Sequence, residues 1–411
     1  MKLSEELTWR GFVNQTTFTD VAELDDEPRT FYLGVDPSAP SMHIGNLAQV
    51  MVVKHLIAHG HKAIVLVGGA TGMIGDPKQD SERDLKTLDE IARNKDGIAM
   101  QYRQLLEGEV FELVDNYDWF RDIGYLNFLR EIGKHFSMTQ LLDRDFVQSR
   151  IGEGGVGISY AEFSYSLIQG YDFLHLYRTY GATLQIGGSD QWGNMLSGAQ
   201  MIKKLEGGEA HVWTVPLVID TSTGKKFGKS EGNAIWLDPQ LTSPYQFYQF
   251  WLNTDDKMAE DLIKIFTLLD RDTVSSVIET HHTNPGARTL QKTIAREVTS
   301  LVHSKEACHA VERVNDVLFG SHAFSSLSNE DVDALASEIP TVELKDAVMV
   351  SDILRTAGVV ASKGEARRLE QSGAVTIIGG EHENLKLEND IFINKVPTLI
   401  KKGKNTFILV R

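Results

Sequence analysis

FYLGVDPSAPSMHIGNLAQ, residues 31–49 of this 411-residue chain, is the stretch that best indicates how the chain folds. Its first apolar run suits a buried strand, Asp36 and Pro37 break that run, and a helical spacing of apolar residues resumes after Pro40. The stretch therefore predicts a strand, a loop and a helix that begins near Ser41.

The predicted helix start suits a phosphate group. The first backbone N–H groups of a helix are unpaired and carry partial positive charge. His43 and Asn46 are three residues apart and would share one face of the helix. Taken alone, the simpler interpretation is a helix capped by Ser41 with a solvated His43. A second basic segment, residues 225–230, makes the phosphate interpretation stronger.

Three more strands are expected, and each runs into a loop rich in glycine or lysine. Residues 62–67 precede GGATGMIGDP, residues 183–186 precede GGSDQWGN, and residues 213–219 precede KKFGKS. The strand that begins at Phe31, the helix after it and the strand of residues 62–67 form a βαβ unit with parallel strands. Ligands of such sheets bind at the carboxyl ends of the strands. The sequence therefore predicts an α/β fold whose first two loops meet at that edge.

Composition is ordinary for a soluble globular protein of two or three domains, with 42% apolar and 24% charged residues. Cys308 is the only cysteine, so neither an internal disulfide nor a cysteine zinc cluster is expected. A protein without disulfides is expected in a reducing compartment, here the cytoplasm. The N-terminus reads as neither a signal nor a transit sequence, and no apolar run is long enough to span a membrane.

The net charge of −16 is unevenly distributed. Residues 344–411 hold eleven Lys and Arg residues against eight Asp and Glu residues, whereas the rest of the chain holds 30 against 49. Residues 244–319 have a helical period almost throughout, and residues 320–341 are Ser-rich and acidic like a linker. The basic tail is therefore expected to be a small separate module that binds a polyanion.

Two common nucleotide-binding motifs are absent. The glycines of residues 68–75 fall as GGxxGxxG and not as the GxGxxG of dinucleotide-binding proteins. A P-loop ending in Gly228, Lys229 and Ser230 would need a glycine where Thr223 stands. A dehydrogenase and a P-loop NTPase are therefore both disfavoured.

Polar residues on an otherwise apolar helix indicate a pocket. Tyr165, Gln169 and Asp172 lie at helical spacing and form one polar stripe, while their neighbours are mostly apolar or aromatic. A solvated face or a satisfied core network is the alternative. Because a buried carboxylate must find a donor, we favour a pocket for a polar ligand. Lys226 and Lys229 lie in a loop that follows a strand of the same sheet, which suits a mobile phosphate clamp.

Taken together, HIGN at residues 43–46 and KFGKS at residues 226–230 resemble the paired signatures of class I aminoacyl-tRNA synthetases. The segments FYLGVDPSAPSMHIGNL, LVGGATGMIGDP, FSYSLIQGYDF and LQIGGSDQWGN resemble bacterial tyrosyl-tRNA synthetases, and the resemblance covers essentially the whole chain. It implies a Rossmann-like catalytic domain in residues 1–225, the KFGKS loop and a helical domain in residues 226–320, a linker in residues 321–344, and a small α+β, S4-like RNA-binding domain in residues 345–411.

The resemblance also implies roles for individual residues. The catalytic positions around the ATP phosphates are His43, Asn46, Lys226, Lys229 and Ser230, with Ser38 and Arg83 in supporting positions. The tyrosine-binding positions are Tyr32, Asp76, Tyr165, Gln169, Asp172 and Gln191. The ATP-binding positions are Gly34, Asp36, Ser38, His43, Gly45, Asn46, Gly188, Asp190 and Lys229, and the tRNA-binding positions are Lys363, Arg367 and Arg368.

The implied activity is that of a tyrosine–tRNA ligase, which activates L-tyrosine with ATP and transfers it to the terminal ribose of tRNA(Tyr). Mg²⁺ would accompany ATP, no protein-bound metal is expected, and the family implies a cytoplasmic homodimer with no membrane contact. Asn46 replaces a His of many class I enzymes, but its amide can still donate to phosphate. Leu33 replaces a small polar residue beside the ribose. The rivals are the related tryptophan enzyme, against which Tyr32 and Asp172 argue, and a noncatalytic RNA-binding relative, against which the intact lysines of KFGKS argue.

Overall fold

The computed structural model describes residues 1–77, 84–142, 145–220, 224–230, 233–320, 322–344, 346–380, 382 and 384–411. Its contacts divide the chain into two compact units. Unit 1 comprises Met1–Thr242 and Trp251–Val298, and unit 2 comprises Ser243–Phe250 and Thr299–Arg411. The division into four segments made from the sequence stays a prediction.

Unit 1 is built on a six-stranded sheet with the order β1-β6-β5-β2-β3-β4. The strands are β1 Gln15–Thr16, β2 Thr30–Val35, β3 Lys62–Val67, β4 Phe111–Asp115, β5 Ala182–Gly188 and β6 His211–Val215. All neighbouring pairs are parallel except β1 with β6. The chain adds β3 and β4 on one side of β2 and later adds β5 and β6 on the other. This reversal creates a crevice between the carboxyl ends of β2 and β5, which is where such sheets bind ligands.

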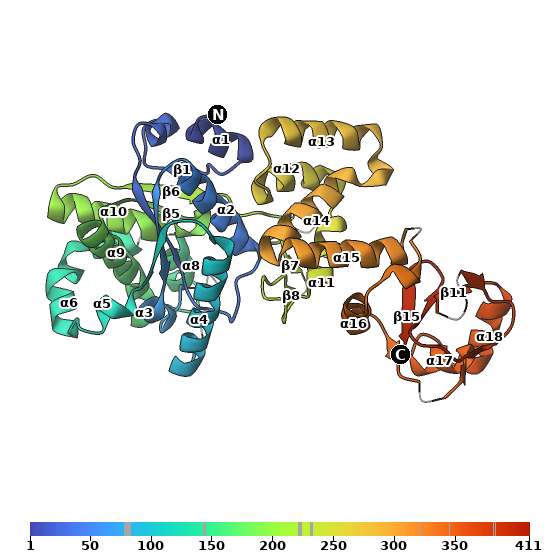
Figure 1. Ribbon diagram of the computed structural model, residues 1–411. Coiled ribbons are helices and arrows are strands. Elements are labelled where there is room, and N and C mark those ends of the chain that lie inside the picture. The colour runs from blue at the N-terminus through green and yellow to red at the C-terminus, as the bar shows by residue number, and fades with distance from the viewer. Residues whose placement is uncertain are drawn as a thin grey trace. The chain divides into compact units, whose positions relative to one another are not determined.

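Helices cover the sheet of unit 1 on both faces (Figure 1). The helices that precede or connect its strands are α1 Leu3–Arg10, α2 Ile44–Ala58, α3 Gly69–Gly72, α4 Leu88–Leu105, α5 Tyr117–Phe120, α6 Tyr125–Glu131, α7 Met138–Leu142, α8 Asp145–Ile151, α9 Tyr160–Tyr180 and α10 Trp192–Glu206. The short hairpin of β7 Lys229–Ser230 and β8 Asn233–Ala234 follows, and then α12 Asp256–Phe266 and α13 Arg271–Thr283. The 3-10 turns are Val21–Asp25, Gly133–His135, Ser189–Gln191 and Pro285–Ala287.

The start of α2 differs from the sequence prediction. The helix begins at Ile44 and not near Ser41, because His43 takes the capping position with an extended backbone. The Nδ1 atom of His43 accepts a hydrogen bond from the backbone N–H of Gly45, and the Oδ1 atom of Asn46 accepts one from the N–H of His43. His43 and Asn46 therefore form a reciprocal capping box, and only Asn46 lies within the helix.

Unit 2 combines a helical part with a small α+β part. Its helices are α15 Lys305–Leu318, α16 Asn329–Glu338, α17 Val350–Thr356 and α18 Lys363–Gln371, and a 3-10 turn forms at Phe324–Ser326. A five-stranded sheet has the order β12-β11-β14-β15-β9, formed by β9 Thr341–Val342, β11 Val375–Gly379, β12 Leu385–Lys386, β14 Thr398–Lys402 and β15 Thr406–Val410. A second small sheet pairs β10 Val348–Met349 with β13 Phe392–Ile393. The chain passes between the units just before α11 Pro244–Leu252, again within α11, and once more within α14 Thr289–Val302.

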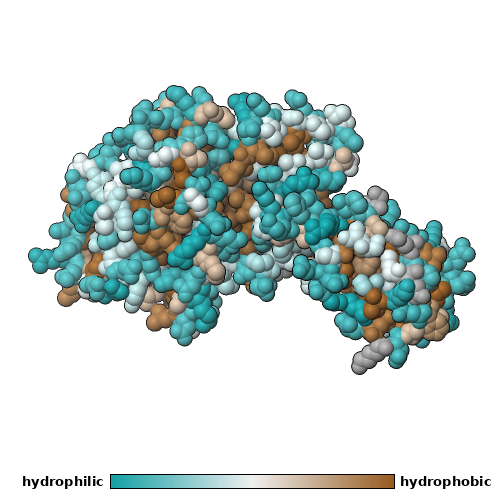
Figure 2. Space-filling model, in the orientation of Figure 1, coloured by the Kyte–Doolittle hydropathy of each residue, from teal (hydrophilic) through white to brown (hydrophobic). Residues whose placement is uncertain are grey.

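Several of the exposed large apolar side chains of unit 1 belong to one segment. Between residues 125 and 160 these are Tyr125, Leu126, Met138, Ile151, Val156 and Tyr160. Figure 2 shows apolar residues reaching the surface in the region where Figure 1 places α5 and α6. Within the described ranges, no helix has the length and apolar character needed to cross a membrane.

Candidate active site

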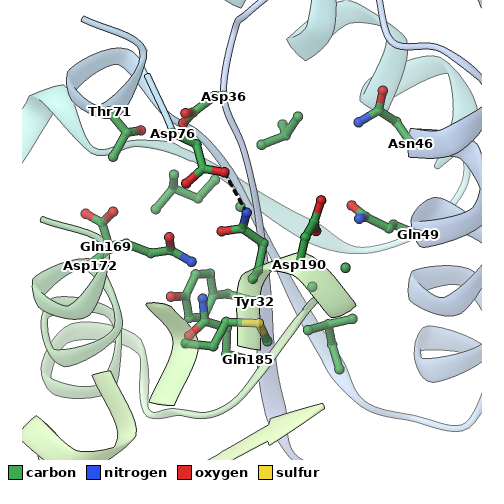
Figure 3. Close-up of a pocket in the computed structure, with 18 of the residues that line it drawn as sticks. Tyr32, Asp36, Asn46, Gln49, Thr71, Asp76, Gln169, Asp172, Gln185 and Asp190 are labelled. Atoms are coloured by element: carbon green, nitrogen blue, oxygen red, sulfur yellow. Dashed lines mark hydrogen bonds between the residues drawn. The ribbon is translucent and has the colours of Figure 1, made fainter. Parts of the chain in front are cut away.

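A cleft with about 1000 Å³ of space lies at the carboxyl ends of β2 and β5. In Figure 3, Gln169 and Asp172 project from α9 on one side of it, Asn46 and Gln49 project from α2 on the other, and Asp190 lies between them. The predicted residues that line it are Tyr32, Gly34, Asp36, Ser38, Asn46, Asp76, Tyr165, Gln169, Asp172, Gly188, Asp190 and Gln191. Sequence reasoning thus identified residues from five separate segments that the fold brings into one cleft.

Asp172 is the most deeply buried acid of the cleft, with 2% of its surface exposed. Burial raises the pKa of its carboxyl group well above the usual value, while two hydrogen bonds act in the opposite direction. Asn116 donates to Oδ2 at 3.1 Å and the indole N–H of Trp119 donates to Oδ1 at 2.9 Å. These two donors hold the carboxyl group in a fixed orientation at the closed end of the cleft.

Three buried polar atoms of the cleft have no hydrogen-bond partner among the described residues. They are the hydroxyl of Tyr32 and the side-chain oxygens Oε1 of Gln169 and Gln185. Burial, with the nearby Asp172, also raises the pKa of Tyr32 well above its usual value, so this hydroxyl remains protonated and able to donate. Because unpaired buried polar groups are costly, these three atoms indicate a polar ligand that completes their hydrogen bonds.

A second network of hydrogen bonds lies beside Asp172. Gln191 donates to Asp76 Oδ2 at 2.9 Å, which is the bond drawn as a dashed line at Asp76 in Figure 3, and Asn194 donates to Asp76 Oδ1 at 3.3 Å. The hydroxyl of Tyr165 donates to Asp36 Oδ2 at 2.8 Å. Burial raises the pKa of Tyr165 well above its usual value, so it stays a donor. This part of the cleft therefore presents two carboxyl groups whose orientations are held by amide and hydroxyl donors, which suits a cationic group.

The start of α2 forms a second cavity of about 780 Å³ that adjoins the first. Asn46, Gln49, Gly188 and Asp190 line both cavities, so the two share one wall. The other predicted residues that line the second cavity are His43, Gly45 and Lys226. The helix start, where the helix dipole places partial positive charge, thus opens onto a space that continues into the cleft.

The KFGKS segment is connected to the start of α2 through the backbone. Ile235 N–H donates to Gly228 O at 3.0 Å, and Ile44 N–H donates to Ile235 O at 3.1 Å. Gly228 has a φ of 73°, and a Cβ atom there would lie 2.3 Å from the side chain of Ile44, so both its conformation and its packing favour glycine. Lys226 Nζ lies 3.1 Å from Asp190 Oδ2. Two segments almost two hundred residues apart in sequence therefore meet at one site.

Some predicted positions lie elsewhere. The side chains of Lys229 and Ser230, and the whole of Arg83, lie outside the described residues. Lys363, Arg367 and Arg368 lie on α18 of unit 2. There Lys363 Nζ is 2.6 Å from Asp352 Oδ1, and Arg367 Nε is 3.7 Å from Asp390 Oδ2.

Other residues of the site were not identified from the sequence. These are Gln49, Thr71, Gln185 and Met195, which line the cleft, and Asn116, Trp119 and Asn194, which bond to its acids. Asn194 is the last residue of GGSDQWGN, so its place in that loop was a usable signal. Asn116 and Trp119 follow β4, and only the sheet order brings the end of this strand toward α9.

Comparisons with known proteins agree with this geometry. A family model described as tRNA synthetases class I (W and Y) matches residues 24–320, and a model of the tyrosine–tRNA ligase C-terminal domain matches residues 331–410. The tyrosine–tRNA ligase of Bacteroides thetaiotaomicron is 42% identical, with 100% of this chain and 99% of the relative covered. That of Streptococcus pyogenes is also 42% identical, with both chains fully covered.

Solved structures show the same fold. A C-terminally truncated mitochondrial tyrosyl-tRNA synthetase of Aspergillus nidulans has a TM-score of 0.70 and 30% identity, covering 77% of this chain and 94% of that one. A tryptophanyl-tRNA synthetase of Encephalitozoon cuniculi has a TM-score of 0.54 at 14% identity, covering 81% of this chain and 91% of that one, which is a likeness of fold alone. The chain belongs to the class I tRNA synthetases of the tryptophan and tyrosine group and, within that group, to the tyrosine–tRNA ligases.

Proposed function

We propose that the cleft of unit 1 binds L-tyrosine and ATP side by side, joins them as tyrosyl-adenylate, and then transfers tyrosine to the 3′-terminal ribose of tRNA(Tyr). The tyrosine ring would enter the closed end of the cleft, and the nucleotide would occupy the part next to α2. The observation that carries the proposal is the pairing of a buried carboxyl group, Asp172, with the unpartnered buried hydroxyl of Tyr32.

A phenol matches this pair of groups. The tyrosine hydroxyl can donate one hydrogen bond and accept another, so it can bond to Asp172 and accept from Tyr32. Phenylalanine would leave both protein groups unpaired in a buried site, which costs binding free energy. Tryptophan has an indole N–H that donates but no oxygen that accepts. The chemistry of the closed end therefore favours tyrosine over both competitors.

The remaining contacts of the amino acid follow from the acids of the cleft. We assign the substrate ammonium group to Asp76, Tyr165 and Gln169, because this part of the cleft offers carboxylate and amide oxygens. Gln191 would donate to the substrate carboxylate, and it already donates to Asp76. These contacts would fix the carboxylate so that it faces the nucleotide.

The nucleotide would bind along β2, β5 and the start of α2. Gly34, Asp36, Ser38 and Gly45 lie along that path. Gly188 and Asp190 would bind the ribose, since Asp190 offers a carboxylate to its hydroxyls. The phosphates are assigned to His43, Asn46, Lys226, Lys229 and Ser230, which would bring side-chain donors and two cations to the positive end of the α2 dipole.

The reaction requires no protein nucleophile. The tyrosine carboxylate oxygen attacks the α-phosphorus of ATP, the bond to the bridging oxygen breaks, and pyrophosphate leaves with Mg²⁺ as its counter-ion. In the second step, a ribose hydroxyl of tRNA attacks the carbonyl carbon and AMP leaves. Rate enhancement would come from positioning and from donors that meet charge as it develops on the phosphate oxygens.

Unit 2 is assigned to the RNA. Lys363, Arg367 and Arg368 lie on one short helix of the basic C-terminal segment, and phosphate contacts from such a helix would depend strongly on salt. Acidic neighbours already hold Lys363 and Arg367, whereas Arg368 donates to the Gly364 carbonyl of its own helix. Arg368 would therefore be the first of the three to reach an RNA phosphate.

The chain is further proposed to act as a homodimer in the cytoplasm. Support for a second copy comes from the exposed apolar segment between residues 125 and 160, where Leu126 is 77% and Val156 is 67% exposed. Apolar surface of this kind is characteristic of protein interfaces. Sedimentation of the Leu126→Arg variant should give half the parent mass, and an unchanged mass would remove this support. The single, buried Cys308 fits a reducing compartment.

The assay that tests the proposed function is ATP–pyrophosphate exchange, run in parallel with tyrosine, tryptophan and phenylalanine. We expect exchange that depends on tyrosine and is far slower with the other two amino acids. Exchange driven best by tryptophan, or none with any of the three, would refute the assignment.

A further inference from the structure

One face of α4 supports the loop that leads into α2. Asn94, Gly97 and Gln101 are spaced i, i+3 and i+7 on this helix, so they lie on one side of it. All three contact residues 37–42, the segment between β2 and the capping residue His43. None of the three lines either cavity described above.

Each contact fixes a different point of the loop. The buried Asn94 donates from Nδ2 to the carbonyl oxygen of Pro37 at 3.0 Å. Gly97 brings the helix so close that a Cβ atom would lie 2.6 Å from the carbonyl oxygen of Pro40. Gln101 accepts from the N–H of Met42 at 2.8 Å and donates to Ser41 Oγ at 2.7 Å.

The hydroxyl of Ser41 extends these contacts to a second segment. Ser41 is 3% exposed, and its Oγ also accepts from the N–H of Asp238 at 3.1 Å. Leu237 N–H donates to Met42 O at 2.9 Å. Residues 235–238 follow the KFGKS hairpin directly, so Gln101 and Ser41 join α4, the loop before α2 and the segment after the lysine loop at one point.

We propose that Asn94 and Gln101 of α4 are positioning residues that hold the loop before α2, and through Ser41 the segment after KFGKS, at the separation that ATP requires. This inference rests on the proposed function, because it assigns the phosphates to these two segments. It assigns no substrate contact to α4. Its consequence is that defects in α4 should affect ATP use and leave tyrosine binding intact, since Tyr32 and Asp172 lie on β2 and α9.

The first test compares Gln101→Met with Arg103→Met. Methionine has a length similar to that of glutamine but cannot replace its two hydrogen bonds. Arg103 lies two positions further along α4, is exposed, and therefore points away from the loop. We expect Gln101→Met to lower kcat/KM for ATP in tyrosine-dependent exchange by about tenfold to a hundredfold, because displacement of a positioning group by about 1 Å can cost this much. The tyrosine Kd should change by less than about twofold, and Arg103→Met should match the parent.

Gly97→Ala provides a second variant, which perturbs the loop by adding an atom and does not weaken the helix. Alanine favours helix more than glycine does, so α4 should not be weakened, yet the added Cβ must displace Pro40. We expect the same loss in kcat/KM for ATP with no loss of tyrosine affinity. Because it adds an atom instead of removing hydrogen bonds, this variant keeps the proposal testable even if Gln101→Met folds poorly.

A double-mutant cycle decides whether Gln101 acts through Ser41. If it does, the fold-loss of Gln101→Met combined with Ser41→Ala should be smaller than the product of the two single losses. A fold-loss in the double variant equal to the product of the two single losses would refute the link. Equal losses in ATP and tyrosine parameters, accompanied by a lower Tm, would show a merely structural role and overturn the proposal. A parent enzyme with no exchange would instead contradict the proposed function, so the two failures are distinguishable.

Discussion

Tyr32→Phe should weaken tyrosine binding without weakening the fold. The side chain of Tyr32 is 1% exposed, and its hydroxyl has no hydrogen-bond partner among the described residues. When the protein folds without ligand, this hydroxyl therefore loses its hydrogen bonds to water and gains none from the described residues in their place. Removing it leaves the ring, which packs against Phe173 at a centroid distance of 5.2 Å, in place.

The size of the effect follows from the hydrogen bond that tyrosine would supply. A neutral hydrogen bond contributes about 0.5–1.5 kcal/mol, so the tyrosine Kd should rise about twofold to thirteenfold. Phenylalanine lacks the partner atom and should lose no affinity. The free energy of unfolding should stay the same or rise by about 1 kcal/mol, because the variant no longer buries an unpaired hydroxyl.

Tyr102→Phe is the matched control. Tyr102 is fully buried, its hydroxyl is also without a partner in the described structure, and burial raises its pKa above the usual value. It does not line the cleft. The same atom is removed from the same kind of environment, so stability should respond as in Tyr32→Phe, while the tyrosine Kd should not change.

The assay is equilibrium binding of tyrosine and of phenylalanine to the parent and both variants, with urea unfolding of each. The reasoning is refuted if Tyr32→Phe leaves the preference for tyrosine over phenylalanine at the parent value. It is also refuted if Tyr102→Phe lowers that preference to the same extent, since the effect would then not belong to the cleft.

Further predictions concern the phosphates, the fold and pH. Lys226→Ala should lower kcat of tyrosine-dependent exchange by about tenfold or more, because it removes a cation that meets developing charge, and equilibrium dialysis should find an unchanged tyrosine Kd. Glu162→Gln should lower the free energy of unfolding in urea by about 3–5 kcal/mol, because it removes the buried carboxylate charge that lies 2.9 Å from the buried Arg150 guanidinium, and an unchanged midpoint would contradict this. Burial lowers the pKa of His61 from 6.5 to about 4, so the unfolded chain binds more protons between these values. The free energy of unfolding should therefore fall on acidification from about pH 6.5 toward pH 4, and His61→Asn should make this fall shallower.

Local sequence patterns were sufficient for most elements of the sheet. Residues 62–67 are continuously apolar after the first lysine, and the structure forms β3 over Lys62–Val67. The start of α2 was placed three residues too early because Ser41 is the commoner capping residue. In the fold, Ser41 is instead engaged by Gln101 and Asp238, and the imidazole of His43 caps the helix.

The cleft itself was predicted only in part from the sequence. The polar stripe of α9 was readable because its neighbours are apolar, and Asp172 was found in this way. Asn116 and Trp119 could not be found, since their contact with Asp172 depends on β4 lying at the edge of the sheet beside β3. Gln185 lies in a strand whose residues are nearly all buried, and no local pattern indicates which of them faces a ligand.

The most direct test of the account is a crystal structure of the enzyme with a non-hydrolysable tyrosyl-adenylate analogue. The account predicts the phenol oxygen within about 3 Å of both the Tyr32 hydroxyl and the Asp172 carboxyl group. It also predicts the phosphate group beside His43 and Asn46 at the start of α2. A ligand bound outside this cleft, or with its phenol directed away from Asp172, would contradict it.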